Sequence, residues 1–169
     1  MEVVIDNFLS EYQFKQISNV ILTDRFPWYW NEEILPPNDA NYDPNIYQLV
    51  HRIFDLADRG ILSADYSVCD TLQQRLGVRK LDRIKMNLTP RTFFHRKGGM
   101  HIDLSEVTSI QKTAIFYVNT NNGWTEFKKG GKVKSVANRI VIFDSNLEHQ
   151  GVTCTDKKRR VVINFNYDV

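Results

Sequence analysis

Residues 98–105, with the sequence GGMHIDLS, place a histidine and an aspartate on either side of one isoleucine. In an extended strand, side chains two positions apart project from the same face. We therefore expect a strand here, with His101 and Asp103 converging while Ile102 points away. His149 follows the apolar run RIVIF further along the chain. Two imidazoles and one carboxylate form the facial triad that binds Fe(II) and leaves adjacent coordination positions open.

A basic pair, Arg159 and Arg160, follows His149 and opens the run VVINFNY. A guanidinium offers a carboxylate two parallel hydrogen bonds and a permanent positive charge. A dicarboxylate that chelates a metal at one end needs such a partner at its other end. Register decides which arginine is available, because Arg160 shares its face with Asn164 and Asn166, whereas Arg159 lies on the apolar face. We favour Arg160 and keep Arg159 as the alternative.

The composition fits one globular domain of 169 residues, with 42% hydrophobic and 25% charged residues. A net charge of +2 does not by itself indicate nucleic-acid binding, although a local basic patch leaves that class open. Cys69 and Cys154 form no CxxC motif and indicate free thiols in a reducing compartment. The first residues do not resemble a signal peptide, and no apolar run is long enough for a membrane span. We expect a cytoplasmic protein that does not interact with membranes.

Helix signals are concentrated in the first half of the chain. Ser10 and Gln13 have the spacing of a capping box, which predicts a helix after Ser10. A second, short helix is predicted over Ser67 to Leu76, with Gly77 as its end. The run NIYQLVHRIF, residues 45–54, is compatible with either a strand or a helix.

Strand signals dominate from residue 79 onward. β-branched and aromatic runs bounded by turn residues are KLDRIKMNL, KTAIFYVN, NRIVIFDS and RVVINFNY. Helices followed by strands predict an α+β fold with an antiparallel sandwich or jelly roll. We expect one domain over residues 1–169, in which 1–78 supply supporting helices and loops and 79–169 form the core with the site.

The strand run RIKMNL alternates strictly between polar and apolar residues. Arg83, Lys85 and Asn87 share one face, and Ile84 and Met86 belong to the other. Such a strand is typical of a sheet with one face in water. Alternatively, the polar face lines a solvated cavity while the N-terminal helices cover the apolar face.

The spaced histidines and aspartate, with an arginine opening RVVINFNY, resemble the non-haem Fe(II)- and 2-oxoglutarate-dependent oxygenases. The most similar branch is the prolyl-hydroxylase-like group, which includes small phage and bacterial forms. KTAIFYVNTNNGWTEF resembles the strand of that group ending in Tyr-x-Asn, followed by a turn and a Gly-x-Thr-x-Phe segment. NRIVIFDSNLEHQG resembles the strand that carries its second histidine. The resemblance covers about residues 80–167 and, more loosely, IDNFLS near the start.

This resemblance implies a double-stranded β-helix, or jelly roll, whose larger sheet is braced by the N-terminal helices. It also implies that His101, Asp103 and His149 ligate iron. The cosubstrates would be 2-oxoglutarate and O2, with ascorbate as a supporting reductant. In the family, 2-oxoglutarate is converted to succinate and carbon dioxide while an unactivated C–H bond is hydroxylated.

The same resemblance assigns the 2-oxoglutarate site. Arg160, or Arg159 as the alternative, would bind the far carboxylate together with Tyr117. Thr113 would line the same pocket, and Asn87 falls near another position that contacts the cosubstrate in relatives.

Two aromatic side chains are candidates for substrate contact. Trp124 stands where many relatives have a second glycine, so it either re-aims the turn or forms a substrate wall. His95 belongs to a loop that is either a substrate lid or a plain basic loop. The leading function is hydroxylation of a prolyl residue in a peptide or protein. The alternatives are the same chemistry on a nucleobase or small metabolite, and a β-helix binding module without catalysis.

Overall fold

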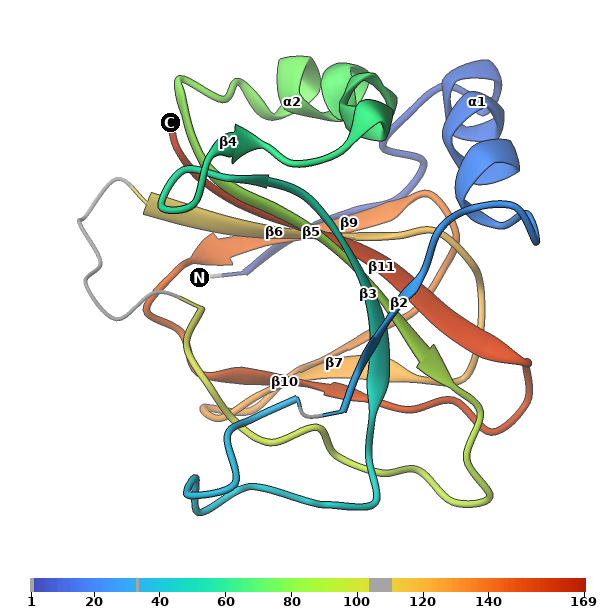
Figure 1. Cartoon of the computed structure of the whole chain (residues 1–169), viewed down its shortest axis with the longest axis vertical. Helices are drawn as coiled ribbons and strands as arrows, with labels where there is room; N and C mark the ends of the chain where they lie inside the picture. Colours follow the sequence, from blue (N-terminus) through green and yellow to red (C-terminus); the bar gives the residue numbers. More distant parts are fainter. Residues whose placement is uncertain (1, 33, 104–110) are drawn as a thin grey trace.

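The computed structural model of this chain describes residues 2–32, 34–103 and 111–169. Within them, two antiparallel sheets are packed together and short helices lie along one side of the larger sheet (Figure 1). The larger sheet contains, in spatial order, β1 (Val3–Ile5), β9 (Arg139–Asp144), β6 (Gln111–Tyr117), β11 (Arg159–Asp168), β5 (Lys80–Pro90), β3 (Gln48–Asp55) and β2 (Tyr29–Asn31), with β4 (Gly60–Ile61) paired to β3. The smaller sheet contains β10 (His149–Val152), β7 (Trp124–Phe127) and β8 (Lys132–Lys134).

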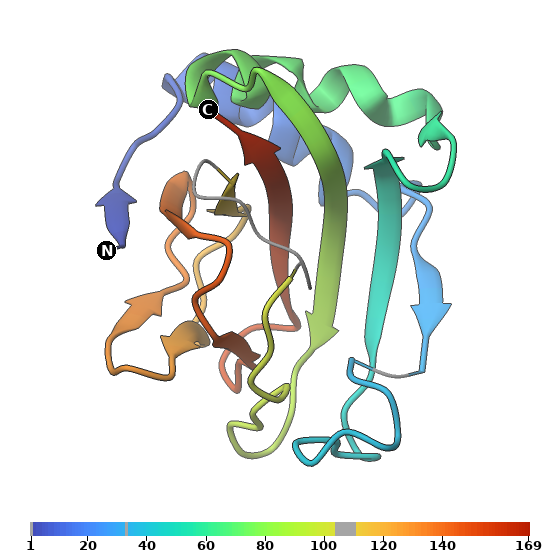
Figure 2. The same cartoon turned by 90° about the vertical axis from the view of Figure 1, so that its left-hand side faces the viewer.

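The four strand runs predicted in the second half of the chain are confirmed as β5, β6, β9 and β11. Figure 2 shows three long strands of the larger sheet, β11, β5 and β3, side by side. The segment that the sequence left undecided, residues 45–54, contributes β3. The architecture is therefore mostly antiparallel sheet with few helices, as expected for a jelly-roll core.

The N-terminal part contains strands as well as the two helices predicted after Ser10 and over Ser67 to Leu76. Its helical elements are α1 (Glu11–Ile21), a 3-10 segment η1 (Ala64–Cys69) and α2 (Asp70–Leu76). The predicted capping box is confirmed, since Ser10 Oγ accepts from the Gln13 amide and Gln13 Oε1 accepts from the Ser10 amide. Gly77 ends α2 in the left-handed conformation, at φ 66°. Residues 1–78 also supply strands β1 to β4, so helices and loops are only part of what they contribute.

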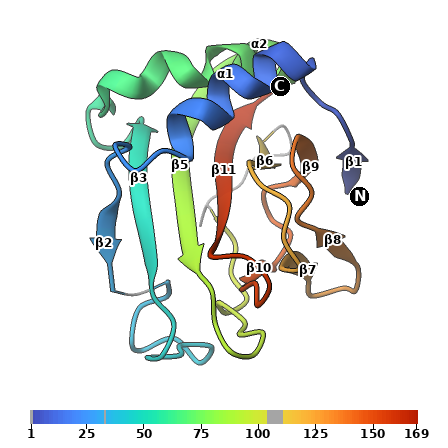
Figure 3. The same cartoon turned by 90° about the vertical axis from the view of Figure 1, so that its right-hand side faces the viewer.

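The helices lie along one side of the larger sheet (Figure 3), and the main hydrophobic core is formed by side chains of both. Ile17 and Ile21 of α1 and Leu72 of α2 are fully or almost fully buried in it. The strands contribute the apolar side chains of their alternating pattern, including Ile84 of β5 and Phe165 of β11. Burial of these residues stabilises the packing of the helices on the sheet.

The polar side chains of β5 and β11 point the opposite way, into a pocket between the two sheets. This confirms the second reading of the alternating pattern, in which the polar face lines a cavity. The pairing of β5 with β11 arranges the inner face in rows, namely Arg83 with Asn166, Lys85 with Asn164, Asn87 with Val162 and Thr89 with Arg160. No helix among the described residues has the length and apolarity that crossing a membrane requires.

Candidate active site

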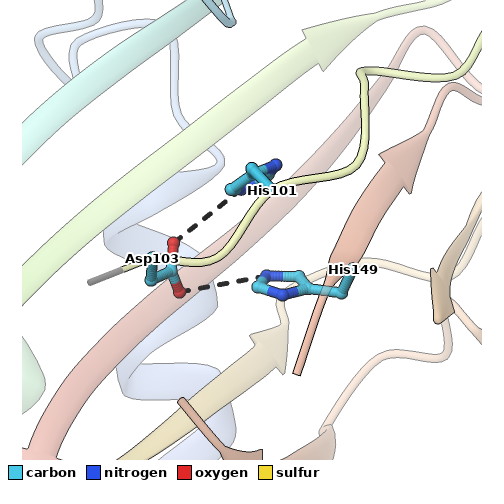
Figure 4. Close-up of side chains that lie close together, drawn as sticks. All are labelled: His101, Asp103 and His149. Carbon is cyan, nitrogen blue, oxygen red and sulfur yellow. Dashed lines mark ion pairs between the residues drawn. The ribbon is translucent and has the colours of Figure 1, made fainter. Parts of the chain in front are cut away.

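His101, Asp103 and His149 come together (Figure 4), and all three line this pocket. One ligand-type atom from each lies within 4.8 Å of the other two. The Nε2 atom of His101 is 3.8 Å from Asp103 Oδ1, and that of His149 is 3.9 Å from Asp103 Oδ2. Three convergent ligands on one side of an open space are what a facial triad requires.

The expected strand over the His-x-Asp segment is wrong. His101 forms only an isolated bridge, in which its backbone N–H and C=O pair with those of His149 at 3.0 Å each, and Asp103 lies in a bend. The segment is therefore attached to the smaller sheet at one residue. Backbone pairing of the two histidines nevertheless places their imidazoles next to each other, with ring centres 4.9 Å apart.

Both imidazoles are oriented by backbone carbonyls. Nδ1 of His101 lies 2.9 Å from the carbonyl oxygen of Gly99, and Nδ1 of His149 lies 3.0 Å from that of Leu147. Because a carbonyl can only accept, each Nδ1 donates its proton to it, and Nε2 is the ring nitrogen on the Asp103 side. Burial lowers the pKa of His149, against the attraction of Asp103, and so favours the neutral, ligating form.

Asp103 is almost fully buried and held by three side chains that the sequence analysis did not assign to it. Arg83 Nη2 donates to Oδ1 at 3.0 Å, and Asn166 Nδ2 donates to Oδ2 at 3.1 Å. Thr113 Oγ1 lies 3.4 Å from Oδ2. Burial alone would raise the pKa of Asp103, but His149, Arg83 and the other nearby donors hold it below its usual value. The carboxylate is therefore ionised and fixed in orientation.

Arg160 lies in the wall of the pocket and is 5% exposed. Its Nε donates to Ser135 Oγ at 2.9 Å and its Nη2 to Thr125 Oγ1 at 3.1 Å. The Tyr117 hydroxyl donates to the same Thr125 oxygen at 2.8 Å. Since Thr125 accepts twice, its own proton remains available to a group in the pocket that it lines.

Arg159 points to the opposite side of the sheet, where its Nη2 donates to the backbone carbonyl of Leu22. Arg160 thus faces the pocket and Arg159 faces away from it, as the alternation of side chains along the strand predicts. The Arg160 guanidinium lies 5.6 Å from the centre of the Tyr117 ring. Burial raises the pKa of Tyr117, so its hydroxyl stays protonated and can donate.

Two glycines, Gly123 and Gly151, leave the space that the Arg160 side chain occupies. A Cβ added at Gly123 would lie 3.0 Å from Arg160 Cδ and 2.7 Å from the Val152 carbonyl oxygen. A Cβ at Gly151 would lie 3.4 Å from Arg160 Nη1. Gly151 is two residues from His149 on β10, so the guanidinium reaches from the larger sheet to the strand that carries His149.

The remaining predicted contacts are divided between the pocket and other places. Asn87 lines the pocket, and its Oδ1 is buried without a hydrogen-bond partner among the described residues. Thr113 is buried beside Asp103 and Ser145 instead of lining the pocket. Trp124 and His95 contact each other, with ring centres 4.7 Å apart, and neither belongs to the pocket lining.

No family model matches this chain, and no match is found among the curated proteins. Solved structures do match over nearly its whole length. A 2OG-Fe(II) oxygenase family oxidoreductase from Burkholderia pseudomallei aligns with a TM-score of 0.70 and 12% identity, covering 99% of this chain and 84% of that one. The non-haem α-ketoglutarate-dependent epimerase SnoN from nogalamycin biosynthesis aligns with a TM-score of 0.66 and 11% identity. The alignment covers 98% of this chain and 76% of that one.

A prolyl hydroxylase from Trichoplax adhaerens, solved with a peptide of the hypoxia inducible factor oxygen degradation domain, aligns with a TM-score of 0.63 and 18% identity. The alignment covers 99% of this chain and 83% of the prolyl hydroxylase. Identities this low establish the fold and leave the activity to the residues of the site. The chain therefore has the jelly-roll fold of the 2-oxoglutarate- and Fe(II)-dependent oxygenases, prolyl hydroxylases among them, as its sequence motifs indicated.

Proposed function

We propose that this protein is an Fe(II)- and 2-oxoglutarate-dependent dioxygenase that hydroxylates an unactivated C–H bond. His101, Asp103 and His149 would hold the iron through two neutral Nε2 atoms and one carboxylate. This donor set suits Fe(II), and the open side of the triad faces the pocket. The backbone carbonyls behind the imidazoles and the donors around Asp103 supply the outer contacts that such ligands need.

The observation that carries the proposal is the state of Arg160. A buried guanidinium is costly unless a counter-charge compensates it. Among the described residues, no carboxylate forms an ion pair with Arg160, whose partners are two neutral hydroxyl groups. A dicarboxylate whose other end lies at the triad would provide that charge, and Thr125 has a further proton to donate to it.

Each part of the chain then has a defined task. When bound, iron and 2-oxoglutarate supply the oxidising chemistry, with succinate and carbon dioxide as by-products. The protein orients them: Arg160 and Thr125 would fix the far carboxylate, Tyr117 would hold Thr125 in place by donating to it, and Asn87 offers a polar group without a partner among the described residues. The buried pocket excludes water from the reacting groups. Ascorbate would serve, as in related enzymes, to keep the iron reduced.

A prolyl residue of a peptide or protein is the first substrate class to test. Its support is the alignment with a prolyl hydroxylase that was solved with a peptide. A small metabolite is the second class, supported by the alignment with an epimerase from nogalamycin biosynthesis. A cytoplasmic location and a nucleobase substrate remain expectations from the sequence alone.

The direct test is formation of succinate from 2-oxoglutarate by the purified protein in air with Fe(II). Proline-containing peptides and small prolyl compounds would be added as prime substrates. We expect succinate that depends on the protein and on iron, and loss of it in Asp103→Ala. The variant's fold would be checked by circular dichroism. Well-folded wild-type protein that makes no succinate with any of them would contradict the proposal and favour the binding module.

A further inference from the structure

Lys85 is a charged side chain of the pocket that neither the triad nor the 2-oxoglutarate site uses. It lies on β5, half-buried, and lines the pocket between the row of Arg83 and the row of Asn87. Asn164 of β11 lies beside it in the sheet on one side, and Arg52 of β3 on the other. The lysine therefore belongs to the middle of the inner face, next to the end that holds Asp103.

No acidic side chain within the described ranges forms an ion pair or hydrogen bond with Lys85. Asp103 attracts it without a hydrogen bond or ion pair between them, and the carboxylate oxygens accept from Arg83 and Asn166. Arg52 repels it and has its own partners in Asp55 and Asp58. Burial and the charge of Arg83 lower the pKa of Lys85, as expected for an ammonium group without a counter-ion.

The groups around Lys85 share this lack of partners. Oδ1 of Asn164 and Oδ1 of Asn87 are both buried and make no hydrogen bond to any described residue. Asn164 is the neighbour of Lys85 across the sheet, and Asn87 is two residues along β5. Rotation of a side-chain amide exchanges its oxygen and its NH2 group, so the two asparagines can present donors beside the Lys85 ammonium, and the three side chains form a polar cradle in the pocket lining.

Binding of Fe(II) and 2-oxoglutarate does not cancel the positive charge of the pocket at Lys85. The pocket lining contains three basic side chains, Arg83, Lys85 and Arg160, and one acidic side chain, Asp103. The two charges of Fe(II) cancel those of the 2-oxoglutarate dianion, so the loaded pocket keeps a positive surplus. Arg83 is paired with Asp103, and Arg160 is assigned to 2-oxoglutarate. Lys85 is the remaining cation without a counter-charge.

We propose that Lys85 binds an anionic group of the prime substrate, a carboxylate or a phosphate, close to the C–H bond that reacts. This inference rests on the proposed function and names the substrate class of the same site. The wall on the β3 side of the pocket is formed by Ile34, Ile46 and Gln48, so the body of the substrate is largely uncharged. A prolyl substrate would present a free carboxylate or an acidic neighbour here.

The test compares two ligands that differ by one charge, N-acetyl-L-proline and N-acetyl-L-prolinamide, with inorganic phosphate as a third probe. Each is titrated calorimetrically into the anaerobic protein loaded with Fe(II) and 2-oxoglutarate. We expect the acid to bind at least about tenfold more tightly than the amide, since a desolvated charge pair outweighs a neutral contact. Binding of phosphate as well would point to a phosphate-bearing substrate, and binding of the acid alone to a carboxylate.

The variants are Lys85→Met, which keeps the length of the stem, Lys85→Arg, which keeps the charge, and Lys128→Met as a surface control. We expect Lys85→Met to lose the preference for the acid, and the other two to keep it. The absorbance of the Fe(II)–2-oxoglutarate complex is recorded for every variant. Its midpoint in 2-oxoglutarate should move less than about twofold in Lys85→Met.

Three outcomes would overturn the inference. Equal binding of acid and amide, or no binding of any anionic probe, would remove the anionic substrate. Loss of the 2-oxoglutarate complex in Lys85→Met would assign the lysine to the cosubstrate. If wild-type protein forms no such complex, the proposed function itself fails. This result differs from failure of the Lys85 inference, because it is seen in wild-type protein alone.

Discussion

Arg83 Nη2 donates to Oδ1 of Asp103 at 3.0 Å, so a guanidinium compensates the carboxylate of the proposed metal site before any metal is bound. The two side chains come from different segments, β5 and the bend after His101. Asp103 is 5% exposed and Arg83 26% exposed at the side chain, so water screens the pair only in part. This pair leads to the first prediction.

Arg83→Met should lower the free energy of unfolding of the metal-free protein by about 2–4 kcal/mol, because it leaves a buried carboxylate with a weaker counter-charge. A divalent ion should then stabilise the variant more than it stabilises wild type, since it replaces the lost cation. The measurement is thermal unfolding with and without Mn(II). Arg52→Met, which removes a more exposed and ion-paired arginine of β3, is the control. A smaller shift with Mn(II) in Arg83→Met than in wild type would contradict this role.

Arg160→Met should weaken 2-oxoglutarate binding by about 2–5 kcal/mol, while metal binding persists. The adjacent residue gives a matched control, because Arg159 contacts Leu22 on the other side of the sheet. Arg159→Met should bind 2-oxoglutarate as wild type does. Isothermal titration of the Mn(II)-loaded proteins measures both effects. The reverse pattern would assign the carboxylate to Arg159 and refute the placement proposed for Arg160.

Gly99 has φ 91° and lies two residues before His101. A Cβ there would approach Leu35 Cδ1 to 2.2 Å and the Asn41 carbonyl oxygen to 2.9 Å. Gly99→Ala should therefore displace the segment that carries His101 and weaken metal affinity about tenfold or more. Gly130 has φ 96° but nothing within 4 Å of its Cβ position, so Gly130→Ala tests backbone strain without the collision. Equal metal affinity in the two variants would show that the collision is relieved without moving His101.

The metal-free protein should become less stable as the pH falls below about 6.5, the ordinary pKa of histidine. The folded-state pKa of His149 is lowered by burial, so the unfolded chain binds a proton that the native imidazole refuses. Stability therefore rises with pH in this window, by at most about 1.4 kcal/mol per pH unit from this residue.

Urea unfolding between pH 5.5 and 7.5 measures this dependence, and His149→Gln removes the contribution. The lowered pKa of Asp103 adds a separate loss of stability at more acidic pH, below about 4, and the variant retains this loss only in part, because His149 is one of the groups that lower the pKa of Asp103. A slope in His149→Gln equal to that of wild type would show that His149 takes up its proton equally well in both states.

Much of the fold was accessible from the sequence because local chemistry and global packing agree. The capping box at Ser10, the glycine that ends α2 and the four long strand runs are local signals. Each depends on residues that are close together in the sequence. The alternation along β5 and β11 also indicated which faces would meet the helices and which the pocket. The arrangement of Arg159 and Arg160 follows from the same period of two.

The misses concern contacts between distant segments. His101 and Asp103 converge through one bridge to His149 and a bend, which a strand rule cannot anticipate. Arg83 was recognised as a polar residue of the inner face, but its pairing with Asp103 depends on how the later loop folds back. Thr113, which we expect from the sequence to line the cosubstrate pocket, lies beside Asp103, and its partner in the sheet is Asn166 of β11.

The positions of His95 and Trp124 depend on the orientation of the smaller sheet. Trp124 alternates with Thr125 along β7, and the inward place is taken by the threonine that contacts Arg160. Trp124 consequently packs against His95 and under the ammonium group of Lys132. Sequence alone gave no indication of which of the two neighbours would face the pocket.

The central claim is that one pocket holds iron at the triad and 2-oxoglutarate between the triad and Arg160. Anaerobic titration of the purified protein with Fe(II) and 2-oxoglutarate tests it most directly, by the visible absorbance band of the chelated complex. The account predicts a band in wild type and in Arg159→Met, and none in His101→Ala. Well-folded wild-type protein without the band, or a band that persists in His101→Ala, would contradict it.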